Sequence, residues 1–206
     1  MSVQVKICGI TTPEQALMVQ QAGADALGLV IYRKSSRYVD IRQAIAIRAA
    51  IASDVLCVVL LVNADKEFVK QVIAEVKPDL LQFHGDESAE FCQQFGFPYI
   101  RALRMRDDLN IAAEAKAFKS AHSLLFDAWH PGQYGGTGER FDWARLPTER
   151  NFNLILAGGL TPDNVAESVA AVAPDMVDVS GGVESAPGIK DPLRVRDFIQ
   201  RAKAAI

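Results

Sequence analysis

The sequence predicts a single-domain α/β protein, a (β/α)8 (TIM) barrel that spans residues 1–206. Short apolar runs rich in β-branched residues alternate with helix-like segments along the whole chain, which is typical of a parallel sheet. We count eight such runs, and eight strands in 206 residues lie at the lower length limit of the barrel. An open doubly wound sheet rarely needs eight strands in so short a chain. No stretch rich in Pro, Ser or Gly separates two compact halves, so we expect one domain.

The predicted strands cover residues 3–8, 26–31, 55–62, 80–83, 99–103, 123–127, 154–157 and 176–180. Helices are expected between them, because residues that cap the first backbone N–H groups stand where each crossover helix should begin. These caps are Thr12-Pro13-Glu14, Asp40, Asp65, Glu87-Ser88, Asp107-Asp108, Thr161-Pro162-Asp163 and Asp191-Pro192. Residues 128–143 contain few helix formers, so we expect a long loop there and at most a short helix over 142–146.

The composition excludes several classes of partner. Twenty-two basic and 25 acidic residues give a net charge of −3, which is no basis for binding nucleic acid or an anionic membrane surface. The longest apolar run, residues 55–62, is far shorter than the roughly 20 residues that span a bilayer, and no signal peptide is visible. The three cysteines and three histidines lack the spacing of a metal site. We therefore expect a reduced, cytoplasmic protein without metal, acting on a small molecule.

Pairs of glycines follow the last two predicted strands, at Gly158-Gly159 and, after Ser180, at Gly181-Gly182. Active groups of this barrel lie at the carboxyl ends of the strands, and a phosphate site is frequently built after strands 7 and 8. Glycine lets backbone amides approach an oxyanion closely. We predict a phosphate site at these loops, although Gly158-Gly159 can also be explained as a tight turn.

Cys8 ends the first predicted strand. The period of two places Lys6 and Cys8 on the inward face of that strand, with Cys8 at the open mouth of the barrel and Lys6 one layer below. Asp178 on the last strand is inward by the same parity, so a pair between Lys6 and Asp178 is expected where the barrel closes. A lone strand cysteine is usually a small buried hydrophobe, which explains Cys57 and Cys92. For Cys8, the position and the charge of Lys6 favour a reactive thiolate.

Four further polar residues are candidates for the site. Asp127 ends an otherwise apolar strand, where burial would keep part of it protonated as a general acid requires, although a structural cap is the alternative. Arg37 lies in a basic loop; most such runs are solvated, but a guanidinium can grip a substrate carboxylate with two hydrogen bonds. Gln82 and His84 share an inward face and can be either substrate contacts or polar filling of the core.

The glycine-rich segment 132–138 matches neither the P-loop nor the dinucleotide-binding pattern. Gly136-Thr137-Gly138 lacks the third glycine of the latter, because Phe141 stands in its place. We interpret this segment as a mobile lid and expect no nucleotide cofactor.

Seven segments in the same order resemble the phosphoribosylanthranilate isomerase family of tryptophan biosynthesis. They are VKICGIT (5–11), GADALGLVIYRKSSRYV (23–39), LLQFHGDE (80–87), LLFDAW (124–129), YGGTGERFDW (134–143), LAGGLTPDNV (156–165) and DVSGGVESAPGIKD (178–191). The resemblance covers the chain from end to end.

The resemblance implies a cofactor-free Amadori rearrangement, in which N-(5-phosphoribosyl)anthranilate becomes 1-(2-carboxyphenylamino)-1-deoxyribulose 5-phosphate. The general base of the family falls on Cys8, its general acid on Asp127 and its ligand for the anthranilate carboxylate on Arg37. Its phosphate loops fall on Gly158-Gly159 and on residues 180–182. The family includes monomers and homodimers. Two alternatives are another sugar-phosphate epimerase or lyase on the same barrel and a non-catalytic module that binds a phosphorylated metabolite.

Overall fold

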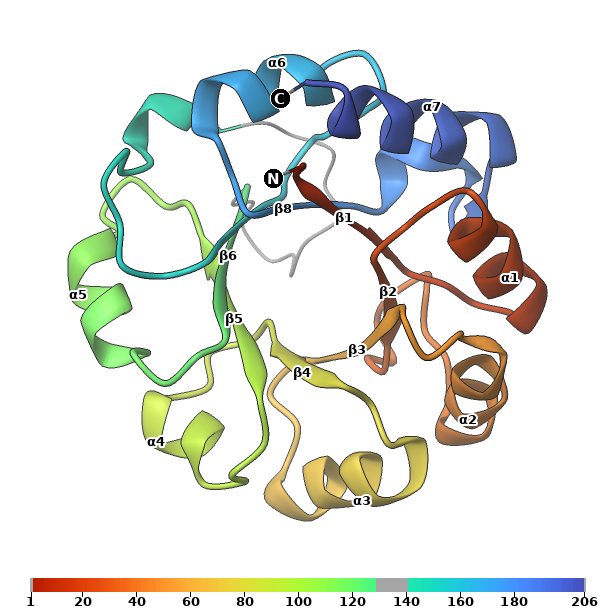
Figure 1. The fold of residues 1–206 in the computed structure, drawn as a ribbon. Helices are drawn as coiled ribbons and strands as arrows, with labels where there is room; N and C mark the ends of the chain where they lie inside the picture. The colour runs from red at the N-terminus through yellow and green to blue at the C-terminus, as the bar shows by residue number, and fades with distance from the viewer. Residues whose placement is uncertain (1, 129–140, 206) are drawn as a thin grey trace.

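In the computed structural model, which describes residues 2–128 and 141–205, eight parallel strands close into a barrel surrounded by helices (Figure 1). The barrel predicted from the sequence is confirmed. Its strands are β1 (Gln4–Cys8), β2 (Ala26–Val30), β3 (Leu56–Leu61), β4 (Leu80–Phe83), β5 (Tyr99–Arg104), β6 (Ser123–Asp127), β7 (Leu154–Leu156) and β8 (Met176–Val179). The predicted strands overlap these bounds and differ by at most one residue at either end. The predicted lid, residues 132–138, lies outside the described residues.

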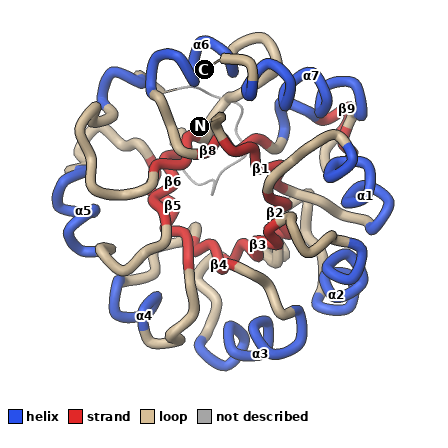
Figure 2. Tube along the Cα trace, in the orientation of Figure 1, coloured by secondary structure: helices blue, strands red, loops and turns tan. Residues whose placement is uncertain are grey.

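The helices form the outer ring that Figure 2 colours blue. They are α1 (Pro13–Gln21), α2 (Ile41–Ala50), α3 (Lys66–Val76), α4 (Ala89–Gln93), α5 (Ile111–Ala117), α6 (Val165–Val172) and α7 (Pro192–Lys203), with short 3-10 helices η1 (Trp143–Arg145) and η2 (Gly181–Val183). Five predicted caps, at Thr12, Asp40, Asp65, Ser88 and Asp191, accept a backbone N–H with their side chains as expected.

Two helix starts were predicted wrongly. The cap of α5 is Asn110 rather than Asp107-Asp108, and its side chain accepts the N–H of Ala113. Helix α6 begins at Val165, because Asn164 folds back, accepts the N–H of Thr161 and donates to the carbonyl of Gly159. Residues 161–164 therefore form a turn next to the predicted phosphate site instead of the first turn of the helix.

A two-stranded antiparallel hairpin, β9 (Glu184–Ala186) and β10 (Ile189–Lys190), follows η2 and precedes α7. This hairpin was not predicted from the sequence. The turn between the two short strands contains Pro187-Gly188, a dipeptide typical of turns. This hairpin brings Glu184 and Lys190 to the end of the barrel where β8 finishes.

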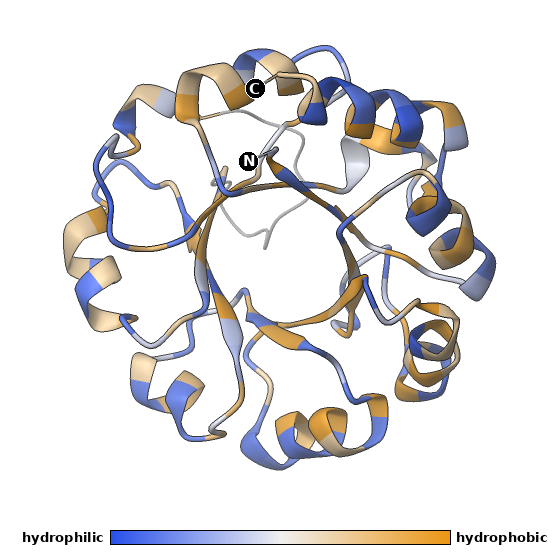
Figure 3. Cartoon of the chain, viewed as in Figure 1, coloured by the Kyte–Doolittle hydropathy of each residue, from blue (hydrophilic) through white to orange (hydrophobic). Residues whose placement is uncertain are grey.

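Among the described residues, buried apolar side chains form three clusters, the smallest of which lies at the carboxyl ends of the first three strands. Outward-facing strand residues such as Ile7, Phe83 and Phe126 pack between the sheet and the helices, and the helix faces turned to the sheet are correspondingly apolar in Figure 3. Ala26, Ile100 and other small or branched side chains fill the lower part of the barrel interior. The polar groups are thus concentrated at the carboxyl ends of the strands, as expected of this fold.

Across the described residues, no helix is both long and apolar enough to cross a membrane.

Candidate active site

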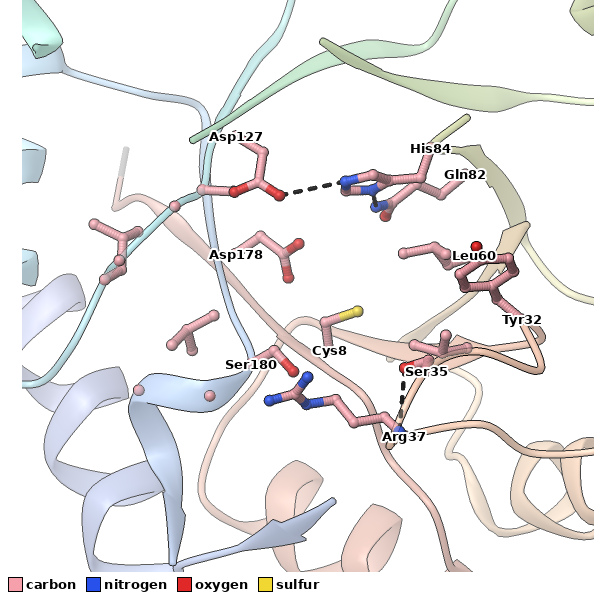
Figure 4. A pocket seen from close by; sticks show the side chains of 18 of the residues that line it. Cys8, Tyr32, Ser35, Arg37, Leu60, Gln82, His84, Asp127, Asp178 and Ser180 are labelled. Atoms are coloured by element: carbon pink, nitrogen blue, oxygen red, sulfur yellow. Dashed lines mark hydrogen bonds and ion pairs between the residues drawn. The ribbon is translucent and has the colours of Figure 1, made fainter. Parts of the chain in front are cut away.

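A pocket opens at the carboxyl ends of the barrel strands, and all ten site residues predicted from the sequence line it (Figure 4). They are Cys8, Arg37, Gln82, His84, Asp127, Gly158, Gly159, Ser180, Gly181 and Gly182. Tyr32, Ser35 and Thr161 also line this pocket and were missed, because nothing in their local pattern distinguishes them from other loop residues. Segments far apart in the sequence therefore meet in one cavity.

Cys8 lies at the end of β1 with 6% of its surface exposed, directly above the pair predicted from strand parity. Strands β1 and β8 are in register at Lys6 and Asp178, and Nζ of Lys6 lies 2.9 Å from Oδ1 of Asp178. The predicted pair is confirmed, and Lys6 is fully buried. Because both charges are compensated inside the barrel, they support the floor of the pocket beneath the thiol.

The electrostatic surroundings of Cys8 differ from expectation. Burial raises the pKa of the Cys8 thiol; the cations Lys6 and Lys190 lower it and Asp178 raises it further, so that the pKa lies above its ordinary value. Lys6 favours the thiolate, as predicted, but its effect is smaller than that of burial, so the unliganded thiol is not activated. Asp178 neutralises much of the influence of Lys6, and the loss of water around the sulfur outweighs the rest.

Asp127 faces a short chain of polar side chains from β4. Its Oδ2 lies 3.3 Å from Nε2 of His84, and Nδ1 of His84 lies 2.9 Å from the side-chain nitrogen of Gln82 (Figure 4). The side-chain nitrogen of Gln82 can only donate, so in this amide orientation Nδ1 of His84 accepts the hydrogen bond. Gln82, His84 and Asp127 therefore lie next to one another in the pocket lining, and Nε2 of His84 forms no hydrogen bond within the described residues.

Arg37 is not the solvated side chain expected from its polar loop. Its side chain is only 15% exposed, and its Nε and Nη2 donate to the two carboxylate oxygens of Glu184, both at 2.8 Å. Glu184 also accepts a hydrogen bond of 2.7 Å from Nζ of Lys190. Glu184 and Lys190 were not predicted from the sequence, and the Pro187-Gly188 turn between them was the signal that could have paired them.

The glycines after β7 and β8 bring the two loops into contact. A Cβ atom at Gly182 would lie 1.9 Å from the carbonyl oxygen of Leu160, so only glycine permits this approach. Within the described residues, the amides of Gly159, Gly181 and Gly182 form no hydrogen bond with a carbonyl of another segment. These N–H groups are therefore available to an anion in the pocket.

The described residues contain no group of three or more His, Cys, Asp or Glu side chains placed to hold a metal ion.

Residues 5–201 match the family model of N-(5'-phosphoribosyl)anthranilate (PRA) isomerase. The chain belongs to this family. It is 50% identical to N-(5'-phosphoribosyl)anthranilate isomerase of Neisseria gonorrhoeae over 97% of this chain and 96% of that protein. Its fold superposes on the isomerase of Thermotoga maritima with a TM-score of 0.88 and 37% identity, covering 98% and 99% of the two chains.

A second solved structure is that of an isomerase of this family in complex with reduced 1-(o-carboxyphenylamino)-1-deoxyribulose 5-phosphate. It has a TM-score of 0.81, is 34% identical and covers 98% of this chain and 99% of its own. The chain is thus an enzyme, the isomerase of tryptophan biosynthesis that rearranges N-(5-phosphoribosyl)anthranilate, and its substrate is a small phosphorylated molecule. This membership decides against the two alternatives that the sequence left open.

Proposed function

We propose that Cys8 and Asp127 are the general base and the general acid of the rearrangement. The observation that carries this proposal is that both side chains, from β1 and β6, point into one pocket (Figure 4). An acid and a base must reach neighbouring atoms of one bound sugar, and this placement meets that requirement. A fluorescence assay for loss of phosphoribosylanthranilate, beside complementation of a tryptophan auxotroph lacking this step, tests the activity directly.

In the proposed sequence of steps, protonated Asp127 gives its proton to the furanose ring oxygen while the anomeric nitrogen donates its electron pair. The bond between C1 and the ring oxygen breaks, which produces a cationic Schiff base. The thiolate of Cys8 then removes the proton from C2, and the electrons of that bond neutralise the nitrogen. The resulting enolamine becomes the aminoketose when C1 gains a proton and the 2-hydroxyl group loses one. The enzyme and the substrate exchange only protons in these steps, so we propose that no metal or organic cofactor is needed.

The cationic Schiff base also counteracts the raised pKa of the Cys8 thiol. A free thiol is only a few per cent ionised at pH 7, and burial lowers that fraction further in the unliganded protein. A positive charge that forms next to the sulfur stabilises the thiolate at the stage when the base is needed. The substrate thus contributes to the activation of its own base.

We propose that the substrate phosphate lies against Gly159, Gly181 and Gly182, held by their free amides. The substitution Gly182→Ala is expected to weaken binding of a phosphorylated product analogue at least about tenfold, because the new Cβ collides with the Leu160 carbonyl and separates the two loops. Titration calorimetry measures this loss.

Gly96→Ala is the matched control for that change. Gly96 lies outside the pocket and, unlike Gly182, has a positive φ, but its Cβ would meet no atom within 4 Å, so this variant is expected to lose stability and keep its affinity. An unchanged affinity in the larger variant Gly182→Glu would place the phosphate elsewhere.

We propose that Arg37 binds the anthranilate carboxylate with the part of its guanidinium that Glu184 leaves unused. Arg37→Met is expected to reduce kcat/KM at least about tenfold, because a charge-assisted contact is lost. The loss of stability is expected to be about 1 to 3 kcal/mol, more than for a surface change, because Glu184 keeps only Lys190 as its cation. Equal losses of affinity for analogues with and without the carboxylate would contradict this role.

We further propose that the enzyme acts in the cytoplasm as a monomer or a homodimer. The support for the location is its place in amino-acid biosynthesis, together with the three unpaired cysteines. Light scattering after size-exclusion chromatography measures the oligomeric state.

A further inference from the structure

Arg37, Glu184 and Lys190 form a compact charged cluster behind the pocket. Lys190 is fully buried at its side chain and Glu184 is 5% exposed. Nζ of Lys190 also lies 3.2 Å from the carbonyl oxygen and 3.4 Å from Oγ of Ser180, at the start of the loop after β8. The hairpin of β9 and β10 thus places a second cation on the carboxylate that already binds Arg37.

The charges of this cluster decide whether Arg37 can attract an anion. Arg37 and Glu184 together are neutral, and the bidentate contact occupies Nε and Nη2 of the guanidinium. A neutral pair has little attraction for a substrate carboxylate, and the oxygens of Glu184 repel it. Lys190 adds one positive charge, so the three groups together carry a net charge of +1.

The side chain of Arg37 is held closely between the loops that follow β1 and β8. A Cβ atom at Gly9 would lie 2.4 Å from Cδ of Arg37, and one at Gly181 would lie 3.2 Å from Nη2. Gly9 has a φ of 80° and belongs to the turn after β1. The guanidinium therefore cannot move freely away from Glu184. Because the side chain stays in this position, its affinity for an anion depends on the charges of Glu184 and Lys190 beside it.

We propose that Lys190 is a positioning residue for substrate recognition: it neutralises Glu184, so that Glu184 can hold Arg37 in place without cancelling its attraction for the substrate carboxylate. Arg37 lines the pocket, whereas Glu184 and Lys190 do not belong to the described lining. Lys190 therefore acts through Glu184 and not by touching the substrate. This inference rests on the proposed role of Arg37 in binding the carboxylate.

The test compares two ligands, the reduced product analogue that carries the carboxylate and its anilino counterpart that lacks it. In Lys190→Met, the affinity for the first is expected to fall about tenfold, while the affinity for the second stays within about threefold of wild type. The double variant Glu184→Gln/Lys190→Met removes one charge of each sign and restores the net charge of +1. It is expected to bind the carboxylate ligand within about threefold of wild type.

Lys203→Met is the matched control, because Lys203 pairs with Asp25 at a partly exposed site on α7. It should leave both affinities unchanged.

Equal losses of affinity for both ligands in Lys190→Met, or no recovery of affinity in the double variant, would overturn the proposal. If Lys190→Met does not fold, the double variant is tested alone, because it leaves no carboxylate without a cation. The proposal is then overturned if the double variant no longer binds the carboxylate ligand more tightly than the ligand without a carboxylate. If wild-type protein and Arg37→Met already show the same preference, the role of Arg37 fails, and with it this inference.

Discussion

Cys8→Ala and Asp127→Asn are each expected to reduce turnover at least about 10²-fold, while fold and product affinity are preserved. Each change removes one of the two groups proposed to transfer protons, while the other residues that line the pocket are unchanged. Cys8→Ser should be nearly as inactive as Cys8→Ala, because a hydroxyl yields almost no anion at neutral pH. Steady-state kinetics on protein free of host isomerase measures these losses.

Cys57→Ala is the control for the loss of a buried thiol. Cys57 is fully buried on β3, outside the pocket lining described here, and burial raises its pKa to about 12. Its replacement is expected to leave turnover within about twofold, because a small core change alters packing rather than chemistry. Near-wild-type turnover in Cys8→Ala would remove Cys8 as the base and direct attention to His84.

Two further measurements separate the acid from the base. A reduced, ring-opened analogue has no ring oxygen to protonate, so it should still bind to Asp127→Asn. Burial raises the pKa of Cys8, so the thiol of the free enzyme is mostly protonated at neutral pH. Its thiolate fraction therefore grows as the pH rises. The value of kcat/KM is therefore expected to increase between about pH 7 and 9, as more of the free enzyme carries the thiolate that the later proton transfer from C2 needs. A profile that falls over this range would contradict the assignment.

Removing one partner of the pair between Lys6 and Asp178 is expected to cost about 3 to 5 kcal/mol of unfolding free energy, because it leaves an uncompensated charge inside the barrel. Urea denaturation of Lys6→Met and Asp178→Asn measures this cost. The double variant should recover part of the loss, since neither charge then remains. An unfolding free energy within about 1 kcal/mol of wild type in both single variants would contradict the structural role.

The surface pair of Lys70 and Glu67 provides the control, because both side chains are more than half exposed. Lys70→Met is expected to cost about 0 to 1 kcal/mol. The pH dependence gives a second check. Burial lowers the pKa of Lys6, but Asp178 and Cys8 outweigh it and hold the pKa above its ordinary value. The contribution of Lys6 is therefore complete below the unfolded pKa of about 10.4 and is lost as the pH rises through the higher folded value.

Much of the barrel and its pocket could be predicted from local patterns. The two-residue period of a strand assigns alternate side chains to opposite faces, and closure of the barrel makes the first and last strands neighbours. These two facts were enough to pair Lys6 with Asp178 and to place Cys8 and Asp127 at the open end. The glycines after the last two strands indicated a phosphate site for a different reason: this fold frequently binds phosphate there, and glycine lets backbone amides approach an anion closely.

Contacts between loops could not be predicted in this way. Nothing near Arg37 in the sequence indicates that Glu184, 147 residues later, occupies its guanidinium, or that Lys190 adds a second cation. Helix α6 begins three residues later than its cap signals indicate, because the side chain of Asn164 forms hydrogen bonds within its own loop.

The sequence by itself thus determined the strand order, the inward faces and the residues gathered at the mouth of the barrel, since these follow from local periodicity and closure. Only the tertiary structure decided how those groups are charged and held. Cys8 illustrates the difference: the sequence supplies a nearby lysine, but the depth of burial and the counter-charge of Asp178 raise the pKa of the thiol. Burial and counter-charges depend on atoms from every part of the fold, so no local pattern contains them.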